Sequence, residues 1–200
     1  MLLRIGITGG SGFIGTHVTN ALKSKYEVVI FDRLKPKING IEFIEGNIID
    51  DSVKNAFEGC DVVIHLAAAV GVKTTEEDPI LTLNTNILGT KNVLEACKSN
   101  NVKKIILASS SEVYGEPLKT PIEESDPAIP ITSYGVSKIA AEEYVKAYAI
   151  SFGLKYTILR FFNAYGPGQS KDFVIPEFVN NASQNNPILI HGSGSQVRSF

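Results

Sequence analysis

Short apolar runs alternate along the chain with longer stretches in which apolar residues recur at helical spacing. The apolar runs predict strands at residues 2–8, 28–32, 41–46, 61–68, 104–108 and 156–160. The stretches between them predict helices at about 13–24, 50–58, 133–151 and 79–100, the last with a mild break at Gly89. This alternation predicts an α/β fold with a doubly wound parallel sheet. Beyond the last of these strands, the pattern predicts a helix near 173–182 and a short strand at 188–190.

In a doubly wound sheet, ligands bind outside the carboxyl ends of the strands. Five residues with chemistry suited to a ligand lie at or just beyond such ends in this chain: Gly9, Asp32, Ala67, Ser110 and Asn163. We therefore expect one binding site to be built from these strand ends.

The first of these ends carries a Gly-x-x-Gly-x-x-Gly turn between a strand and a helix. Gly9 permits a tight turn, Gly12 lets a pyrophosphate approach backbone N–H groups, and Gly15 lets the helix pack closely on the strand. Three glycines alone also suit a flexible loop. The flanking strand and helix, and an acid at the right distance, favour a dinucleotide site of the Rossmann type. Phe13 and Ile14 belong to the same turn.

That acid is Asp32, which closes the second strand. A carboxylate there can accept both ribose hydroxyls of adenosine and repels a 2'-phosphate, which favours NAD over NADP. The neighbouring Arg33 instead favours NADP, because a guanidinium attracts that phosphate. The simpler interpretation of Asp32 is an ordinary turn residue with no ligand. The other residues expected to line the cofactor follow later strands or lie at their ends: Asn47, Ile48, Leu66, Ala67, Ala68, Asn86 and Ser109.

Tyr134 and Lys138 lie one helical turn apart near the start of the helix predicted at 133–151. A free tyrosine has a pKa of about 10, and we expect the ammonium of Lys138 and a positively charged nicotinamide to lower it. With Ser110 sharing the hydrogen bond to a substrate hydroxyl, Tyr134 can take a proton from an alcohol while the nicotinamide takes a hydride. A Tyr-x-x-x-Lys pair also occurs by chance in many helices, so this interpretation depends on the surrounding strand ends.

Composition narrows the class of protein. Of 200 residues, 44% are hydrophobic and 20% are charged, with a net charge of −2, which is typical of globular proteins and argues against nucleic acid as a partner. No apolar run is long enough to cross a bilayer, and we expect no secretory leader, because residues 2–8 already match a strand of the fold. Cys60 and Cys97 lack metal or redox spacing and indicate a reduced, cytoplasmic protein. We expect no metal site, because the histidines stand apart, at His17, His65 and His191.

Four motifs, taken in order, resemble those of a known family. They are residues 8–15 (TGGSGFIG), 109–115 (SSSEVYG), 134–138 (YGVSK) and 160–167 (RFFNAYGP). They are similar to motifs of the extended short-chain dehydrogenases/reductases and, within them, of the NAD-dependent sugar-nucleotide epimerases and dehydratases. UDP-glucose 4-epimerase is the nearest named activity, and the resemblance covers essentially the whole chain.

The resemblance implies an NAD-dependent enzyme that epimerises a nucleotide-diphosphate sugar, a UDP-hexose, at C4 through a 4-keto intermediate. It implies that Tyr134 is the base, that Lys138 tunes its pKa and binds the nicotinamide ribose, and that Ser110 positions the sugar. Asn163 and Arg198 match residues that bind the diphosphate of the substrate. Asn47 and Ile48 match an adenine-side pair whose first member is usually aspartate.

Ser111 and Glu112 mark a branch point among related activities. We expect Ser111 to bind the substrate. It is not an acid, which disfavours a hexose 4,6-dehydratase with an Asp-Glu pair. The same Ser-Glu pattern also resembles UDP-glucuronate decarboxylases and GDP-mannose dehydratases, in which the glutamate acts. Glu112 is therefore either a working base or a structural carboxylate. A non-catalytic NAD-binding module is the alternative of another class, against which the intact Tyr134, Lys138 and Ser110 argue.

The resemblance also predicts how the chain is divided. We expect an NAD-binding domain at residues 1–165 and the beginning of a substrate-binding part at 166–200. Family members normally continue for roughly another hundred residues, so we expect a truncated chain with good NAD binding and weak or absent turnover. It further implies a homodimer formed through the helix that holds Tyr134 and the helix before the fifth strand.

Overall fold

The computed structural model describes residues 2–190, 192–195 and 197, except for the side chains of residues 72 and 73. The chain divides into two compact units, Met1–Arg160 and Phe161–Phe200. The first unit contains all of the strand ends predicted to bind a ligand except the one at Asn163.

A six-stranded sheet has the order β3-β2-β1-β4-β5-β6. Its strands are β1 (Arg4–Thr8), β2 (Glu27–Asp32), β3 (Glu42–Glu45), β4 (Val62–His65), β5 (Lys104–Ser110) and β6 (Lys155–Phe161). The β1–β2, β1–β4, β2–β3 and β4–β5 ladders are parallel, as predicted. The strand order reverses between β1 and β4, where Thr8 pairs with His65. Such a switch point is where doubly wound sheets bind ligands.

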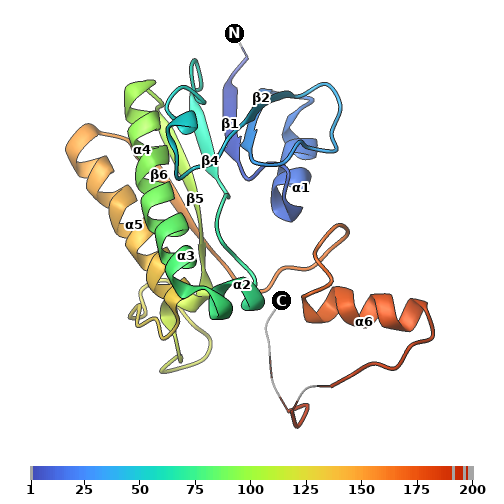
Figure 1. Ribbon diagram of the computed structural model, residues 1–200. Coiled ribbons are helices and arrows are strands. Elements are labelled where there is room, and N and C mark those ends of the chain that lie inside the picture. The colour runs from blue at the N-terminus through green and yellow to red at the C-terminus, as the bar shows by residue number, and fades with distance from the viewer. Residues whose placement is uncertain (1, 191, 196, 198–200) are drawn as a thin grey trace. The chain divides into compact units, whose positions relative to one another are not determined.

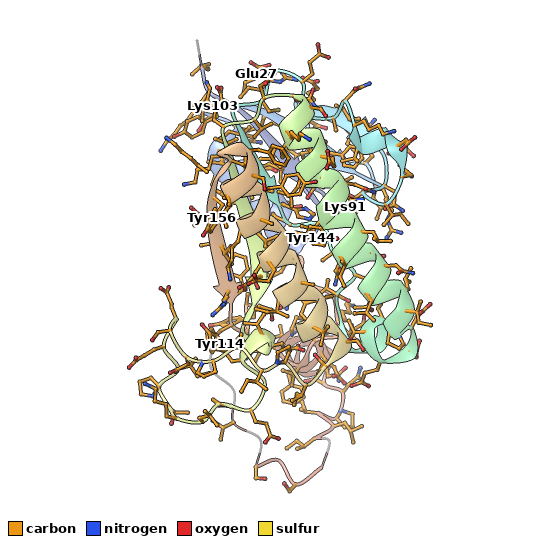
Figure 2. All side chains as sticks on the ribbon, turned by 90° about the vertical axis from the view of Figure 1, so that its left-hand side faces the viewer. Glu27, Lys91, Lys103, Tyr114, Tyr144 and Tyr156 are labelled. Carbon is orange, nitrogen blue, oxygen red and sulfur yellow. The ribbon has the colours of Figure 1, made fainter. Side chains whose placement is uncertain are left out.

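Helices cover both faces of this sheet (Figure 1). Helix α1 (Phe13–Leu22) lies on one face. Helices α4 (Gly89–Ser99) and α5 (Ser133–Phe152) lie side by side on the other (Figure 2). The doubly wound fold predicted from the sequence is thereby confirmed.

Apolar side chains of the strands alternate between two clusters, as expected for a sheet that is covered on both faces. The cluster on the α1 side contains Ile5, Ile7, Val28 and Ile64, with Val18 and Leu22 packed against them. The cluster on the α4 and α5 side includes Val29, Phe31, Val63, Val93, Leu94, Ile105, Leu107, Ala141 and Val145. Cys60 and Cys97 belong to the second cluster as free, buried thiols.

The helix predicted at 79–100 is interrupted before Gly89. Helix α3 (Pro79–Leu83) gives way to a π-helical turn, η2 (Asn84–Leu88), and α4 then begins at Gly89. Gly89 is a regular helical residue whose missing side chain makes room for Ile48, because a Cβ there would lie 2.5 Å from Ile48 Cδ1. The break therefore comes from the π-helical turn and not from the glycine.

Several other elements differ from the predictions. Only a 3-10 turn, η1 (Asp51–Val53), replaces the helix expected at 50–58, because Asp50 accepts from the Ser52 N–H at 3.0 Å and closes a local turn. The fourth strand ends at His65. The prediction of a strand at 188–190 was wrong, since those residues pair with no strand among the described part of the chain. Two elements were not predicted: α2 (Val72–Glu77) and the 3-10 turn η3 (Ser111–Tyr114).

The second unit contains one described helix, α6 (Val174–Ser183), which has no buried residue. Its apolar side chains include Val174 and Val179, both exposed. Across the described residues of both units, no helix combines the length and apolar character that crossing a membrane would require.

Candidate functional site

The glycine turn between β1 and α1 depends on the absence of side chains. Gly9 has a φ of +70°, and a Cβ there would lie 2.7 Å from the backbone nitrogen of Ala67. A Cβ on Gly15 would lie 2.2 Å from the Gly9 carbonyl oxygen. At Gly12, the N-cap of α1, a Cβ would meet only that oxygen, at 3.3 Å, among the described atoms. Open space therefore faces the first N–H groups of α1, which have no partner within the helix.

Asp32 closes β2 beside this turn, and backbone groups hold its carboxylate. Oδ2 accepts from the Ser11 N–H at 3.0 Å, and Oδ1 accepts from the Leu34 N–H at 3.1 Å. Ser11 is part of the glycine turn, so the carboxylate is fixed against that turn. Each oxygen keeps a lone pair that can accept a further hydrogen bond. Arg33 is exposed next to it.

The remaining residues expected to line a cofactor fall into two groups. Ile48 is buried, with its side chain packed against Gly89. The others are partly exposed at the ends of β3 and β4 and in the first turn of α1: Phe13, Ile14, Asn47, Leu66, Ala67 and Ala68. Any contact of Ile48 with a ligand would therefore have to come from its backbone.

A buried chain of hydrogen bonds, centred on His65, runs behind these strand ends. Nδ1 lies 2.6 Å from Thr8 Oγ1, and Nε2 lies 3.1 Å from Thr90 Oγ1. Thr90 gives its hydroxyl proton to the Asn86 carbonyl at 2.6 Å, so His65 donates from Nε2 and accepts at Nδ1. Burial, with a smaller effect of the Lys138 charge, lowers the pKa of His65 to about 3. The neutral ring links β1 to α4 and so has a structural role.

Asn86 extends this chain to α5. Its buried side chain accepts from the Ala69 N–H at 2.7 Å and donates to the Ala69 carbonyl at 3.1 Å and to Ser137 Oγ at 2.9 Å. Ser137 donates to the Tyr134 carbonyl at 2.7 Å. Both amide N–H groups of Asn86 are thus bonded within the protein, and the π-helical turn is the element that directs them inward.

Tyr134, Lys138 and Ser110 meet at the end of β5. The Tyr134 hydroxyl lies close enough to the Ser110 hydroxyl for a hydrogen bond from Ser110 to favour the lower pKa of the phenol. Lys138 is buried, donates from Nζ to the Ala108 carbonyl at 2.9 Å, and lies 5.5 Å from the centre of the Tyr134 ring. The structure therefore brings together a phenol, a hydroxyl and an ammonium, the combination that suits proton exchange with an alcohol.

The pKa of Tyr134 differs from the expectation. Burial raises it to about 12, the charge of Glu112 acts in the same direction, and the hydrogen bond with Ser110 opposes them. Lys138 is not among the causes of this shift, so the protein alone does not lower the pKa of this phenol as the sequence predicted. A further positive charge is needed for Tyr134 to act as a base at neutral pH.

The buried ammonium of Lys138 is expected to make the stability of the protein depend on pH. Burial lowers its pKa from the ordinary 10.5 to about 8. Between these values the unfolded chain binds more protons than the folded protein, so stability rises with pH. We expect the free energy of unfolding, relative to that of Lys138→Met, to rise by about 3 kcal/mol from pH 8 to pH 10.5. Urea unfolding of both proteins measures this, and a pH-independent difference would contradict the buried charge.

Glu112 lies beside this group in η3 and is exposed. Its Oε2 accepts from the Thr132 hydroxyl at 2.8 Å, and its N–H donates to Ser110 Oγ at 3.2 Å. Thr132 is also the N-cap of α5, where it accepts from the Gly135 N–H at 2.9 Å. One carboxylate oxygen is therefore anchored to the start of the helix that carries Tyr134. Ser111, in the same turn, is partly exposed.

Sequence reasoning missed Glu142 and Arg160. Glu142 is fully buried on α5, accepts from Ser109 Oγ at 2.5 Å, and accepts two bonds from the Arg160 guanidinium at 2.9 and 2.7 Å. Ser109, which was expected to contact the cofactor, thus uses its hydroxyl inside the protein. Glu142 follows Lys138 by four residues and Tyr134 by eight, so helical spacing was the signal that could have placed it on the same face.

Two residues expected to bind the substrate are not part of this group. Asn163 is exposed in the second unit, and its distance from residues of the first unit is not defined. Arg198 lies outside the described residues. Their contact with a diphosphate stays a prediction.

Comparison with known proteins identifies the family. Residues 5–200 match the NAD dependent epimerase/dehydratase family. The chain belongs to this family. A relative named UDP-N-acetyl-alpha-D-glucosaminuronate decarboxylase, from Bacillus cytotoxicus, is 40% identical over 219 residues, covering 100% of this chain and 67% of that protein.

Two solved structures of epimerases share the fold. The UDP-N-acetylglucosamine 4-epimerase from Methanobrevibacter ruminantium, in complex with UDP-N-acetylmuramic acid, has a TM-score of 0.92 at 34% identity, covering 100% of this chain and 69% of that one. The UDP-glucose 4-epimerase from Thermus thermophilus, in complex with NAD, has a TM-score of 0.87 at 36% identity, covering 93% and 64%. These matches confirm the family and the Rossmann-type fold expected from the motifs. The chain spans about two thirds of the length of these three proteins.

NAD is the cofactor of this family, and the first unit fits it. The space in front of α1 at Gly12 would be filled by a side chain at any other residue type, and a pyrophosphate needs such space to reach the helix N–H groups. Asp32 is fixed next to this space with lone pairs left for ribose hydroxyls. The glycine turn and Asp32 are therefore the residues suited to hold the adenosine diphosphate part.

Proposed function

We propose that this chain contains the NAD-binding and catalytic residues of a nucleotide-sugar 4-epimerase that acts on a UDP-hexose, UDP-glucose first among them. The closeness of the Tyr134 hydroxyl to Ser110, with Lys138 buried behind the tyrosine ring, is the observation that carries the proposal. This group lies at the carboxyl end of β5, in the same parallel sheet whose β1 end carries the glycine turn.

Each of these residues has a distinct task in the proposed reaction. Ser110 and Tyr134 bind the 4-hydroxyl of the sugar. Tyr134 takes the hydroxyl proton as C4 is oxidised to a ketone, and gives it back when the ketone is reduced from its other face. Lys138 holds a positive charge near the phenol. When bound, NAD supplies the hydride acceptor and donor for C4, and its nicotinamide supplies the further positive charge that Tyr134 needs.

A UDP-glucuronate decarboxylase or a nucleotide-sugar dehydratase is the second candidate, and the position of Glu112 favours it. The charge of Glu112 raises the pKa of Tyr134, so this carboxylate lies close to the hydroxyl that would meet the sugar. A base at that position can act on a sugar that already carries a 4-keto group. The 40% identical relative bears the name of a decarboxylase, which also supports this candidate.

Product analysis distinguishes these activities. The protein is incubated with NAD⁺ and, separately, with UDP-glucose, UDP-glucuronate and dTDP-glucose, and the products are separated by chromatography. Slow formation of UDP-galactose from UDP-glucose is the expected result, in keeping with the weak turnover expected from the sequence. Release of carbon dioxide from UDP-glucuronate would favour a decarboxylase, and a 4-keto-6-deoxy sugar from dTDP-glucose would favour a dehydratase. NAD binding without any product would point to a binding module or an inactive fragment.

Asp32 provides a test of cofactor choice. We expect Asp32→Asn to lower the preference for NAD over NADP by about tenfold, because the charge that repels a 2'-phosphate is removed while the shape is kept. Titration of both dinucleotides, followed by protein fluorescence, measures the two affinities. Asp51→Asn, which removes an exposed acid from η1, is the control and should keep the original ratio. An unchanged ratio in Asp32→Asn would remove the role assigned to this carboxylate.

We also propose a cytoplasmic homodimer, as expected from the sequence. Leu88 in η2 and Val136 in α5 are exposed apolar residues on neighbouring elements, which supports an interface on this side. Light scattering of the purified protein measures the mass in solution, and a monomer at micromolar concentration would contradict the proposal.

A further inference from the structure

We infer that the ion pair between the buried Glu142 and the partly buried Arg160 positions Ser110 and Glu112 for the reaction, because it holds both ends of the segment that carries them. This inference rests on the proposed function, since it concerns the same group of residues. It gives Glu142 and Arg160 a positioning role that acts through Ser109 and Tyr114.

The first end of the segment is held by Glu142. Ser109 Oγ donates to Glu142 Oε1 at 2.5 Å, and both residues are buried. Ser109 directly precedes Ser110, so its side chain fixes the backbone from which the Ser110 hydroxyl projects. The bond from Ser109 therefore holds the end of β5 against α5, the helix that also carries Tyr134.

The other end of the segment is held by Arg160. Its Nη1 donates to the Tyr114 hydroxyl at 2.8 Å, and the guanidinium carbon lies 4.8 Å from the centre of the Tyr114 ring. Tyr114 closes η3, two residues after Glu112. Figure 2 shows Tyr114 close to the first turns of α5, at the opposite end of the sheet from Glu27 and Lys103.

The ion pair between Glu142 and Arg160 has the geometry and the charge needed to hold residues 109–114 in one position. Arg160 Nε and Nη2 donate to the two oxygens of Glu142 at 2.9 and 2.7 Å, so the planar guanidinium and the carboxylate form a bidentate pair. Burial acts to raise the pKa of Glu142, but hydrogen bonds from Arg160 and Ser109 outweigh it and lower the pKa. The carboxylate is therefore charged at neutral pH, and it joins α5 to β6 from a position that is itself fully buried.

The position of Glu142 on α5 relates this ion pair to Tyr134. Tyr134, Lys138 and Glu142 follow one another at intervals of four residues, and each contacts one of three consecutive residues of β5: Ser110, Ala108 and Ser109, respectively. By contrast, η3 is a single 3-10 turn, which has too few internal hydrogen bonds to hold its own orientation. Loss of the Ser109–Glu142 and Tyr114–Arg160 hydrogen bonds should therefore increase the mobility of residues 110–114 while α5 and the sheet stay in place.

Two substitutions remove these hydrogen bonds and leave the ion pair between Glu142 and Arg160 intact. Ser109→Ala deletes the bond to Glu142, and Tyr114→Phe deletes the bond to Arg160 but keeps the ring. In the double variant we expect amide hydrogen exchange at residues 110–115 to rise about tenfold, with exchange in α5 unchanged. Tyr148→Phe is the matched control. Tyr148 also lies on α5, and its hydroxyl donates to Glu95 of α4, so the variant removes a hydroxyl without changing a contact of residues 109–114.

Kinetics separate positioning from a purely structural role. In the double variant we expect kcat to fall about tenfold, with little change in KM or in NAD affinity, whereas Tyr148→Phe should keep both kinetic constants. Exchange and kcat equal to those of the unchanged protein, or equal losses in Tyr148→Phe, would overturn the inference. If the unchanged protein converts no nucleotide sugar, the proposed function fails, while the exchange comparison still decides whether the ion pair holds the segment.

Discussion

Replacement of Tyr134 by phenylalanine is expected to lower turnover by about 10³-fold, because it removes the only atom that exchanges a proton with the sugar hydroxyl in the proposed reaction. The ring and its contact with Lys138 remain, so NAD affinity should change little. Turnover is measured with the nucleotide sugar that the product analysis identifies, and NAD affinity by fluorescence titration.

The matched control for this variant is Tyr144→Phe. Tyr144 lies on the same helix, as Figure 2 shows, and its ring packs against the larger apolar cluster. Its hydroxyl has no part in the proposed reaction, so turnover should stay close to that of the unchanged protein. If Tyr134→Phe kept full turnover, Tyr134 would not be the base, and Glu112 would become the leading candidate for proton transfer.

A side chain at Gly15 is expected to have the largest effect on the fold. A Cβ there would lie 2.2 Å from the Gly9 carbonyl oxygen and 2.6 Å from the Gly10 Cα, and neither backbone atom can move without shifting the turn. We expect Gly15→Ala to lower the free energy of unfolding by about 3 kcal/mol, which corresponds to a midpoint about 10 °C lower. It should also abolish NAD binding, because α1 no longer presents its N–H groups to the pyrophosphate.

Gly12→Ala separates these two effects. Its Cβ would meet only the Gly9 carbonyl oxygen, at 3.3 Å, within the described structure, so thermal unfolding should change little. The methyl group would instead enter the space assigned to the pyrophosphate, and NAD affinity should fall sharply. If Gly12→Ala bound NAD normally, the cofactor would not lie against this turn.

The sheet and the glycine turn could be predicted from the sequence because they depend on residues close together in the chain. Gly9, Gly12 and Gly15 fall within seven positions, and each strand is a short apolar run. Tyr134 and Lys138 were predictable for the same reason. The apolar run at 188–190 shows the limit of this reasoning, since a run of this kind becomes a strand only where another strand can pair with it.

Other features depend on elements that meet only after folding. Glu142 and Arg160 lie 18 residues apart, on a helix and a strand, and no local pattern joins them. The raised pKa of Tyr134 depends on burial and on the charge of Glu112, neither of which spacing reveals. The amide of Asn86 bonds to Ala69 and Ser137 from the π-helical turn, which no local pattern revealed, and its contact with the cofactor stays a prediction.

This turn also restricts how the protein can be altered. Deletion of one residue from Asn84–Leu88 would produce an uninterrupted α-helix, which is the more regular and ordinarily the more stable form. Everything on the amino-terminal side would then rotate by about 100° relative to α4, and Asn86 would lose Ala69 and Ser137 together. An engineer who regularises this helix for heat resistance should therefore expect an inactive protein, and natural relatives that keep the site should keep the chain length here.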